Sequence, residues 1–223
     1  MIHGLTFKEY VDSEKEKLSE MTKAEKFAYF KEYYFKTCIV IVIGLALLTW
    51  FCIDMISSMK HVIVCGGVLN CYITDEGSAF LKEDYMTYLG ASEKSNRVDF
   101  VSSILLTKEQ PESYTMFQAE MAAGTYNYII TDKEGLDYIA KIECISDMNE
   151  AMSPELKSRV EANLVYKKYG DTDEEMAAAV DISDTAFAKK YITSKDTVYF
   201  VLLGKMDAYQ SGLDVLKYIL DKQ

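Results

Sequence analysis

The sequence predicts an α/β protein in which a single N-terminal transmembrane helix is followed by a domain built on a mostly parallel sheet. Two observations carry this prediction. An uncharged apolar run extends from Thr37 to Ile53, and after Lys60 short apolar segments of strand type alternate with segments of helical spacing. Strands that are separated by helices usually pair in parallel, because the helix returns the chain to the edge of the sheet where the strand began.

The first segment, residues 1–36, is expected to be helical and to lie in the cytoplasm. Thr22 and Glu25 have the spacing of a capping box, in which the Thr hydroxyl accepts a free backbone N–H and the Glu side chain bonds back to the cap. We expect one helix to run from this cap into the apolar run. A short amphipathic helix precedes it, with a solvated face as the default and a partner-binding face as the alternative.

The apolar run has the properties of a membrane span. At about 1.5 Å per residue its length approaches the roughly 30 Å hydrocarbon core of a bilayer. Aromatic residues flank it on both sides, between Tyr29 and Phe35 and at Trp50 and Phe51, as they do at membrane interfaces. A buried helix of a soluble protein is the alternative, but such a helix is seldom apolar on every face. We assign residues 37–57 to a transmembrane helix.

The span is expected to be an uncleaved signal anchor in the cell membrane. A cleaved signal peptide has a short charged start and small residues at its cleavage site, whereas 36 residues precede this run and Met55 to Ser58 offers no such site. Four lysines stand shortly before the span and one, Lys60, stands shortly after it. This excess of positive charge predicts a cytoplasmic N-terminus. The four lysines are Lys23, Lys26, Lys31 and Lys36. Residues 58–223 would then form a single α/β domain outside the cytoplasm.

The elements of this domain follow from apolar periodicity and from Gly and Pro boundaries. Strands are expected at 61–65, 97–106, 126–131, 164–169, 176–182 and 197–203, and helices at 76–89, 111–124, 133–141 and 154–163. A closing helix is expected to bury Tyr209, Leu213, Leu216 and Leu220. Because Gly66 and Gly67 follow the first apolar run, we expect them to form the turn after the first strand.

Charge and cysteine content restrict the partners of the domain. Residues 58–223 carry 17 Lys or Arg and 27 Asp or Glu, a net charge of −10. This acidity argues against nucleic acid, whose binding needs basic patches, and favours a solvated exported surface. Cys65, Cys71 and Cys144 allow one disulfide, although small buried hydrophobes are the simpler interpretation.

One stretch of the domain resembles a known family. Met116 to Met152 runs from a helix through Ala123-Gly124, the strand Tyr126 to Thr131, Asp132 and a second helix to Asp147-Met148. It is similar to a segment of bacterial extracellular solute-binding proteins, and the final strand and helix of the chain also look like theirs. The resemblance implies a type 2 periplasmic-binding-like fold with ligand held between two lobes. This chain departs from the family at Asn127, where an Asp is usual, in its helical anchor and in its short length.

Candidate ligand-binding residues stand where open α/β sheets place their ligands, near the ends of strands. They are Gly66, Gly67, Asn70, Asp132, Asp181 and Ser183. We therefore expect a membrane-anchored module that captures a small molecule or peptide. The alternative is a protein-interaction module without a pocket, or an accessory subunit of a membrane complex.

We do not expect an enzyme, a metal or a cofactor. The chain has two histidines, His3 and His61, and neither falls in a catalytic or metal-ligand spacing. A catalytic pair of carboxylates remains an alternative because the chain is so acidic, but no spacing in the sequence singles out one pair.

Overall fold

The computed structural model describes residues 6–58, 60–203 and 206–222. These form two compact units, Met1–Met59 and Lys60–Gln223. The side chains of Phe7, Ser57, Ser58 and 206–209 lie outside this description, and with them the expected burial of Tyr209.

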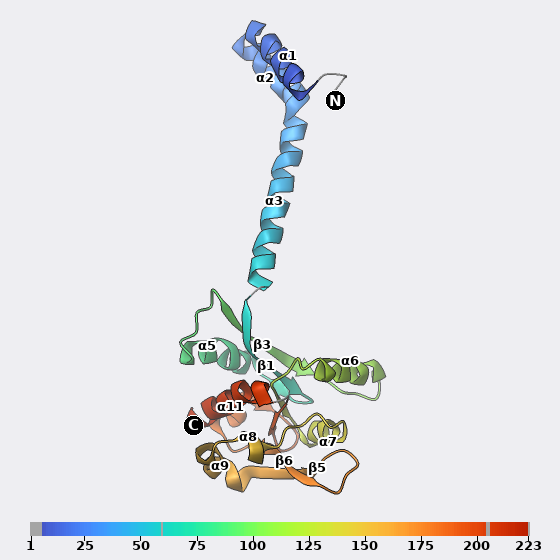
Figure 1. Ribbon diagram of the computed structural model, residues 1–223, viewed down its shortest axis with the longest axis vertical. Coiled ribbons are helices and arrows are strands. Elements are labelled where there is room, and N and C mark those ends of the chain that lie inside the picture. The colour runs from blue at the N-terminus through green and yellow to red at the C-terminus, as the bar shows by residue number, and fades with distance from the viewer. Residues whose placement is uncertain (1–5, 59, 204–205, 223) are drawn as a thin grey trace. The chain divides into compact units, whose positions relative to one another are not determined.

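The regular elements in residues 6–58, the described part of the first unit, are all helices (Figure 1). They are α1 (Phe7–Glu20), α2 (Lys23–Tyr29), the π-helical turn η1 (Phe30–Tyr34) and α3 (Phe35–Ser58). The capping box at Thr22 is present: the Glu25 N–H donates to the Thr22 hydroxyl and the Thr22 N–H donates to the Glu25 carboxylate at 2.8 Å. Thr6 and Glu9 form a second capping box that starts α1. Helical backbone angles continue through η1, so α2, η1 and α3 run as one helix.

This long helix carries the apolar run. Residues Lys23–Ile56 are the one helix of the described chain that is long and apolar enough to cross a membrane. No residue in its most apolar stretch is buried. Long apolar side chains such as Val40 and Leu45 project on all sides. Length and composition of this kind, near an N-terminus, are found in membrane anchors and also in signal sequences.

A buried carboxylate joins α1 to the long helix. The Glu14 side chain accepts hydrogen bonds from the Tyr29 hydroxyl at 2.8 Å and the Tyr34 hydroxyl at 2.7 Å, and it pairs with Lys17 at 3.0 Å. The hydrogen bond from Tyr34, followed by those from Lys17 and Tyr29, lowers the pKa of Glu14 to about 2. Charge-assisted hydrogen bonds of this type are stronger than neutral ones. Glu14 therefore holds α1 beside the tyrosines.

We expect Glu14→Ala to release α1. Hydrogen–deuterium exchange of the full chain in lipid nanodiscs at pH 7 will show lower protection of α1 and unchanged protection of the α/β unit. Glu16→Gln, an exposed position two residues away, is the control. Because the folded-state pKa of Glu14 lies below the ordinary value of about 4.3, the contact is intact above that value and is lost as the pH falls toward about 2. Protection of α1 that is unchanged in Glu14→Ala would contradict this.

The second unit is built on one six-stranded sheet with strand order β3-β1-β4-β8-β6-β5. The strands are β1 (His61–Leu69), β3 (Asn96–Ile104), β4 (Tyr128–Thr131), β5 (Leu164–Lys168), β6 (Glu175–Asp181) and β8 (Tyr199–Leu202). A separate two-stranded ribbon consists of β2 (Tyr72–Ile73) and β7 (Ile192–Thr193). The helices are α4 (Asp75–Ala79), η2 (Phe80–Asp84), α5 (Tyr85–Tyr88), α6 (Pro111–Ala122), α7 (Lys133–Lys141), α8 (Met148–Ala151), α9 (Pro154–Val160), η3 (Glu161–Asn163), α10 (Ala186–Tyr191) and α11 (Met206–Asp221).

The sheet is mixed, so the prediction of a mostly parallel sheet is wrong. Only β3, β1 and β4 pair in parallel, whereas β4–β8, β8–β6 and β6–β5 are antiparallel. No helix lies between β5 and β6, and the turn around Gly170 is too short for a parallel crossover. The chain between β6 and β8 starts and ends at the same edge, because Asp181 is paired with Tyr199. Both connections therefore reverse the strand direction.

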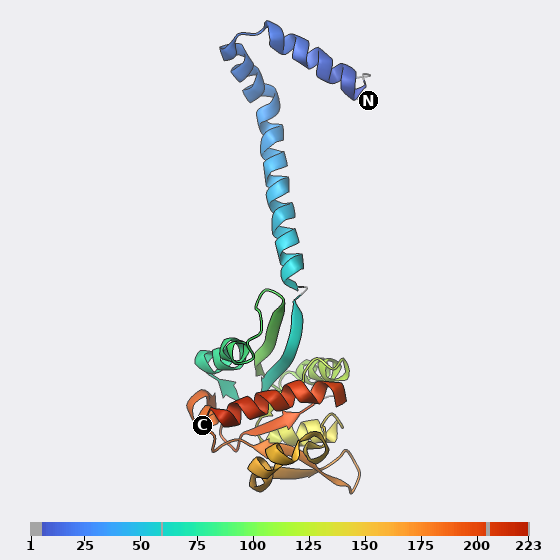
Figure 2. The same ribbon diagram turned by 60° about the vertical axis from the view of Figure 1, so that its left-hand side comes forward.

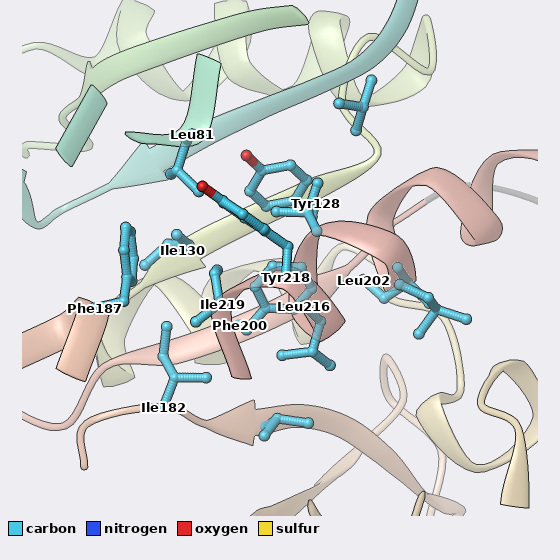
Figure 3. Packing of buried hydrophobic residues seen from close by; sticks show 14 of the residues in the cluster. Leu81, Tyr128, Ile130, Ile182, Phe187, Phe200, Leu202, Leu216, Tyr218 and Ile219 are labelled. Atoms are coloured by element: carbon cyan, nitrogen blue, oxygen red, sulfur yellow. The ribbon is translucent and has the colours of Figure 1, made fainter. Parts of the chain in front are cut away.

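Helices cover both faces of the sheet. Alternate residues of β1 separate the two cores, with Val64 and Val68 on one face and Cys65 and Leu69 on the other. The long helix α11 crosses the first face together with η2, α5 and α9 (Figure 2), and α6 and α7 cover the second. On the first face, Tyr218 and Leu216 of α11 approach Tyr128 and Phe200 of the sheet (Figure 3). The result is a three-layer α/β/α unit.

Candidate functional site

Four of the six predicted residues lie along one edge of the sheet. The parallel pairing of Leu69 with Thr131 places Asn70, which follows β1, beside Asp132, which follows β4. Across β8, Asp181 ends β6 at the same edge, and Ser183 follows it. This edge holds the carboxyl ends of β1, β3, β4 and β6.

Tyr199 connects the two pairs of residues. It begins β8 and is paired with Thr131 on one side and with Asp181 on the other. With neighbouring strands about 4.8 Å apart, the row from Thr131 to Asp181 spans roughly 10 Å. The chain leaves β1 toward β3 and leaves β4 toward the opposite half of the sheet. The edge between β1 and β4 is thus the point at which the strand order reverses, where open α/β sheets bind ligands.

Each of the four side chains also holds the local backbone. The Asn70 side-chain oxygen accepts from the Leu106 N–H at 3.0 Å, and Asn70 itself has a positive φ of 54°. Asp132 caps α7 through the Gly135 N–H at 2.8 Å. Similarly, Asp181 accepts from the Ser183 N–H, and the Ser183 hydroxyl accepts from a backbone N–H at the start of β8. These bonds keep the row in place and use one oxygen of each carboxylate. The second oxygens of Asp132 and Asp181 have no hydrogen-bond partner among the described residues and can accept from other partners.

A glycine and a buried hydroxyl let α7 approach this edge. Thr131 is fully buried, and its hydroxyl has no hydrogen-bond partner among the described residues. A Cβ on Gly135 would lie 2.0 Å from the Thr131 Oγ1. The first turn of α7 therefore closes directly over Thr131 and brings Asp132 onto the strand end.

The sequence prediction missed three residues of this region. Burial raises the pKa of the Cys71 thiol to about 11; a hydrogen bond with Ser194 opposes the rise, and the charges of Asp132 and Asp196 add to it. Ser194 and Asp196 therefore lie near Cys71, which follows the carboxyl end of β1. They were missed because they stand in a loop before β8, where no periodicity marks them. A raised pKa keeps the Cys71 thiol protonated near pH 7, which disfavours nucleophilic attack.

Gly66 and Gly67 do not belong to the edge, so the prediction of a glycine turn after the first strand is wrong. Both lie inside β1, which continues to Leu69. A Cβ on Gly66 would lie 2.1 Å from the Tyr128 ring, whereas at Gly67 it would meet the ends of Ile129 and Ile104 at 3.0 and 3.1 Å. The glycine at position 66 therefore makes room for a core tyrosine.

Two hollows of the α/β unit are lined by other residues. One, of about 130 Å³, lies between α9 and α11 beside Arg159 and Lys217. The other, of about 570 Å³, is wide and shallow and lies beside Lys82 and Arg97. Each is lined by about as many acidic as basic side chains. Neither contains a residue of the carboxyl edge.

The remaining chemistry of the described residues is limited. They contain no group of three or more His, Cys, Asp or Glu able to hold a metal ion. All five cysteines are free thiols in the structure, including Cys65 and Cys144. Comparisons of the chain with protein family models, with curated proteins and with solved structures found no match.

Proposed function

We propose that the chain is a membrane-anchored binding module. In this proposal residues 37–57 are an uncleaved single-pass anchor in the cell membrane, the N-terminal helices are cytoplasmic, and the α/β unit is outside the cytoplasm. The carboxyl edge of its sheet captures a small molecule or peptide. One observation carries the binding part: four residues from separate places in the sequence lie along one edge of the sheet. Asn70 and Asp132 stand at the point where the strand order reverses, and Asp181 and Ser183 lie across β8 from them.

The charge of the edge favours a ligand that bears a positive group. Asp132 and Asp181 each have one carboxylate oxygen engaged by a backbone N–H, and the charges of Asp132 and Asp196 both act on Cys71. Carboxylates on a partly exposed edge attract ammonium or guanidinium groups and bind them through charge-assisted hydrogen bonds. A peptide amino terminus, a basic side chain or a small amine has this chemistry.

The prediction is that neutralising the edge abolishes binding and leaves the fold intact. Asp132→Asn and Asp181→Asn keep a side-chain oxygen for the backbone bonds, since Asn caps helices as well as Asp does. The probes are short peptides containing Lys or Arg, together with polyamines, and the measurement is the thermal shift of the full chain in nanodiscs. A ligand at 100 times its Kd adds about 2.7 kcal/mol to stability. We expect at least one probe to raise the Tm of the wild type and neither edge variant to respond.

Asp171→Asn is the matched control, because Asp171 is an exposed acid in the turn between β5 and β6. It removes the same charge and should respond as the wild type does. A flat response of the wild type to every probe would overturn the ligand site. A response that survives in both edge variants would move the site elsewhere on the domain.

A protein-interaction module is the second candidate. The resemblance to solute-binding proteins implies two lobes, whereas the described part of the α/β unit has one six-stranded sheet and only the short β2–β7 ribbon besides it. A single lobe leaves the carboxyl edge open on one side, where a partner in a membrane complex would cover it. Loss of a crosslinked partner in intact cells on mutation of Asp132 or Asp181, without a thermal response to small probes, would favour this candidate.

A further inference from the structure

The two outer strands of the sheet, β5 and β3, differ in length and in the position of their charged residues. At one end of the sheet, β5 is five residues long and carries Lys167 and Lys168, which pair with Asp137 and, at 2.6 Å, with Asp173. A short outer strand with lysines resists pairing with another chain, because pairing would desolvate those charges. β5 therefore has the features of a protected edge.

The other outer strand, β3, lacks this protection over its second half. It has nine residues and, among the described strands, its ladder is with β1 alone. Its charges, Arg97 and Asp99, stand near its start and pair with each other at 3.1 Å. From Phe100 to Leu106 the sequence is FVSSILL, without a charge or a proline. An uncharged segment of high strand propensity on an open edge is a site where natural proteins pair or aggregate.

Exposure at this edge supports an unoccupied pairing surface. The three consecutive residues 101–103 are all exposed, which a strand covered on both faces does not allow. Val101 is 39% exposed and Leu105, just after the strand, is 54% exposed. The free backbone groups of β3 are thus accompanied by apolar side chains that a partner strand would cover.

We propose that the β3 edge pairs with β3 of a second copy of this chain, antiparallel and centred on Ser102. An antiparallel pair of identical strands is self-complementary, so one contact closes a two-fold dimer. In this register Val101 lies opposite Ser103 of the second copy and Phe100 lies opposite Ile104, so the five paired residues 100–104 are all uncharged. The mutually neutralised Arg97 and Asp99 stand away from the centre. This dimer is independent of the proposed ligand edge.

Two physical terms set the strength of the dimer. The dimer rests on the proposed membrane anchor in one respect: two copies held in one bilayer meet at a raised effective concentration, so a weak strand pairing is sufficient. Each domain carries a net charge of −10, and the resulting repulsion is screened over about 8 Å at physiological ionic strength. The dimer is therefore expected to strengthen as salt is added.

The test is disulfide crosslinking in membranes that contain the full-length chain. Cys38 and Cys52 are first replaced by Ala, and Ser102→Cys is compared with Ser158→Cys, which replaces another exposed serine, on α9. On mild oxidation we expect at least tenfold more crosslinked dimer from Ser102→Cys. Adding Val101→Lys, which gives β3 the lysine that protects β5, should remove most of that dimer without lowering the Tm, because Val101 is partly exposed.

Equal crosslinking at positions 102 and 158 would overturn the dimer, as would crosslinking that survives Val101→Lys. Crosslinking of position 102 to a different protein, with no dimer of this chain, would also overturn it and would assign the edge to another partner. A wild-type chain that is monomeric by mass photometry in nanodiscs at raised salt would contradict it independently.

Discussion

Gly66→Ala is expected to destabilise the α/β unit by about 3 kcal/mol or more, the upper part of the range for overpacked cores. A Cβ at this position would lie 2.1 Å from Cζ and 2.4 Å from Cε1 of Tyr128. Tyr128 cannot move aside, because it is fully buried and its ring is stacked on Phe200 at a centroid distance of 5.0 Å (Figure 3). Thermal unfolding of the full chain, followed by near-ultraviolet circular dichroism, should show a Tm lower by roughly 10 °C.

Gly67→Ala is the matched control for this prediction. It lies next along the same strand, but its Cβ would meet the ends of two isoleucine side chains at 3.0 and 3.1 Å, which can shift, and the Tyr126 ring at 3.4 Å, an ordinary contact distance. Its effect should be much smaller. In a Tyr128→Ala background, Gly66→Ala should cost little further, because the clashing ring is gone. Equal losses for Gly66→Ala and Gly67→Ala would contradict the close approach of β1 and β4.

Two arginines in the middle of the apolar helix are expected to abolish membrane anchoring. Leu45 and Leu48 lie near the centre of α3 and are both more than half exposed. An arginine at the centre of a span raises the free energy of membrane insertion by about 2.5–3.5 kcal/mol on insertion scales. In the double variant Leu45→Arg/Leu48→Arg each arginine adds such a cost. The measurement is the fraction of chain that stays in membranes after alkaline carbonate extraction, which should fall at least tenfold.

Leu45→Ile/Leu48→Ile is the control for this variant, because it keeps the apolar surface and the helix length. Its carbonate-resistant fraction should match that of the wild type. A double arginine variant that stays in the membrane as the wild type does would show that the long helix is not what holds the chain there.

Local sequence signals predicted most of the secondary structure. The pattern of residues 133–141 correctly predicted α7, and Pro111 and Pro154 marked the first residues of α6 and α9. The extent of β1 was missed because Gly66 and Gly67 were interpreted as a turn, whereas their small size serves the packing of Tyr128. The short elements β2, β7, α8 and α10 were also missed, since fewer than seven residues carry little periodicity.

Strand direction was beyond what local patterns could predict. Whether β8 runs parallel or antiparallel to β4 depends on where the intervening chain returns to the sheet, which the pairing of Asp181 with Tyr199 decides. The candidate site shows the same contrast between residues marked by local sequence patterns and residues placed by the tertiary fold. Asn70, Asp132, Asp181 and Ser183 were named as candidates because they stand near predicted strand ends, and the structure places them along one edge of the sheet. Ser194 and Asp196 come near Cys71 only through the tertiary path of a loop.

The most direct test of the anchored module is protease accessibility in intact cells. With a tag at each end of the full-length chain, a protease added outside should remove the C-terminal tag and residues 60–223, while the N-terminal tag stays protected until the membrane is permeabilised. A cytoplasmic marker protein controls for leakage. Protection of the C-terminal domain in intact cells, with its digestion only after permeabilisation, would contradict the topology and the external ligand edge together.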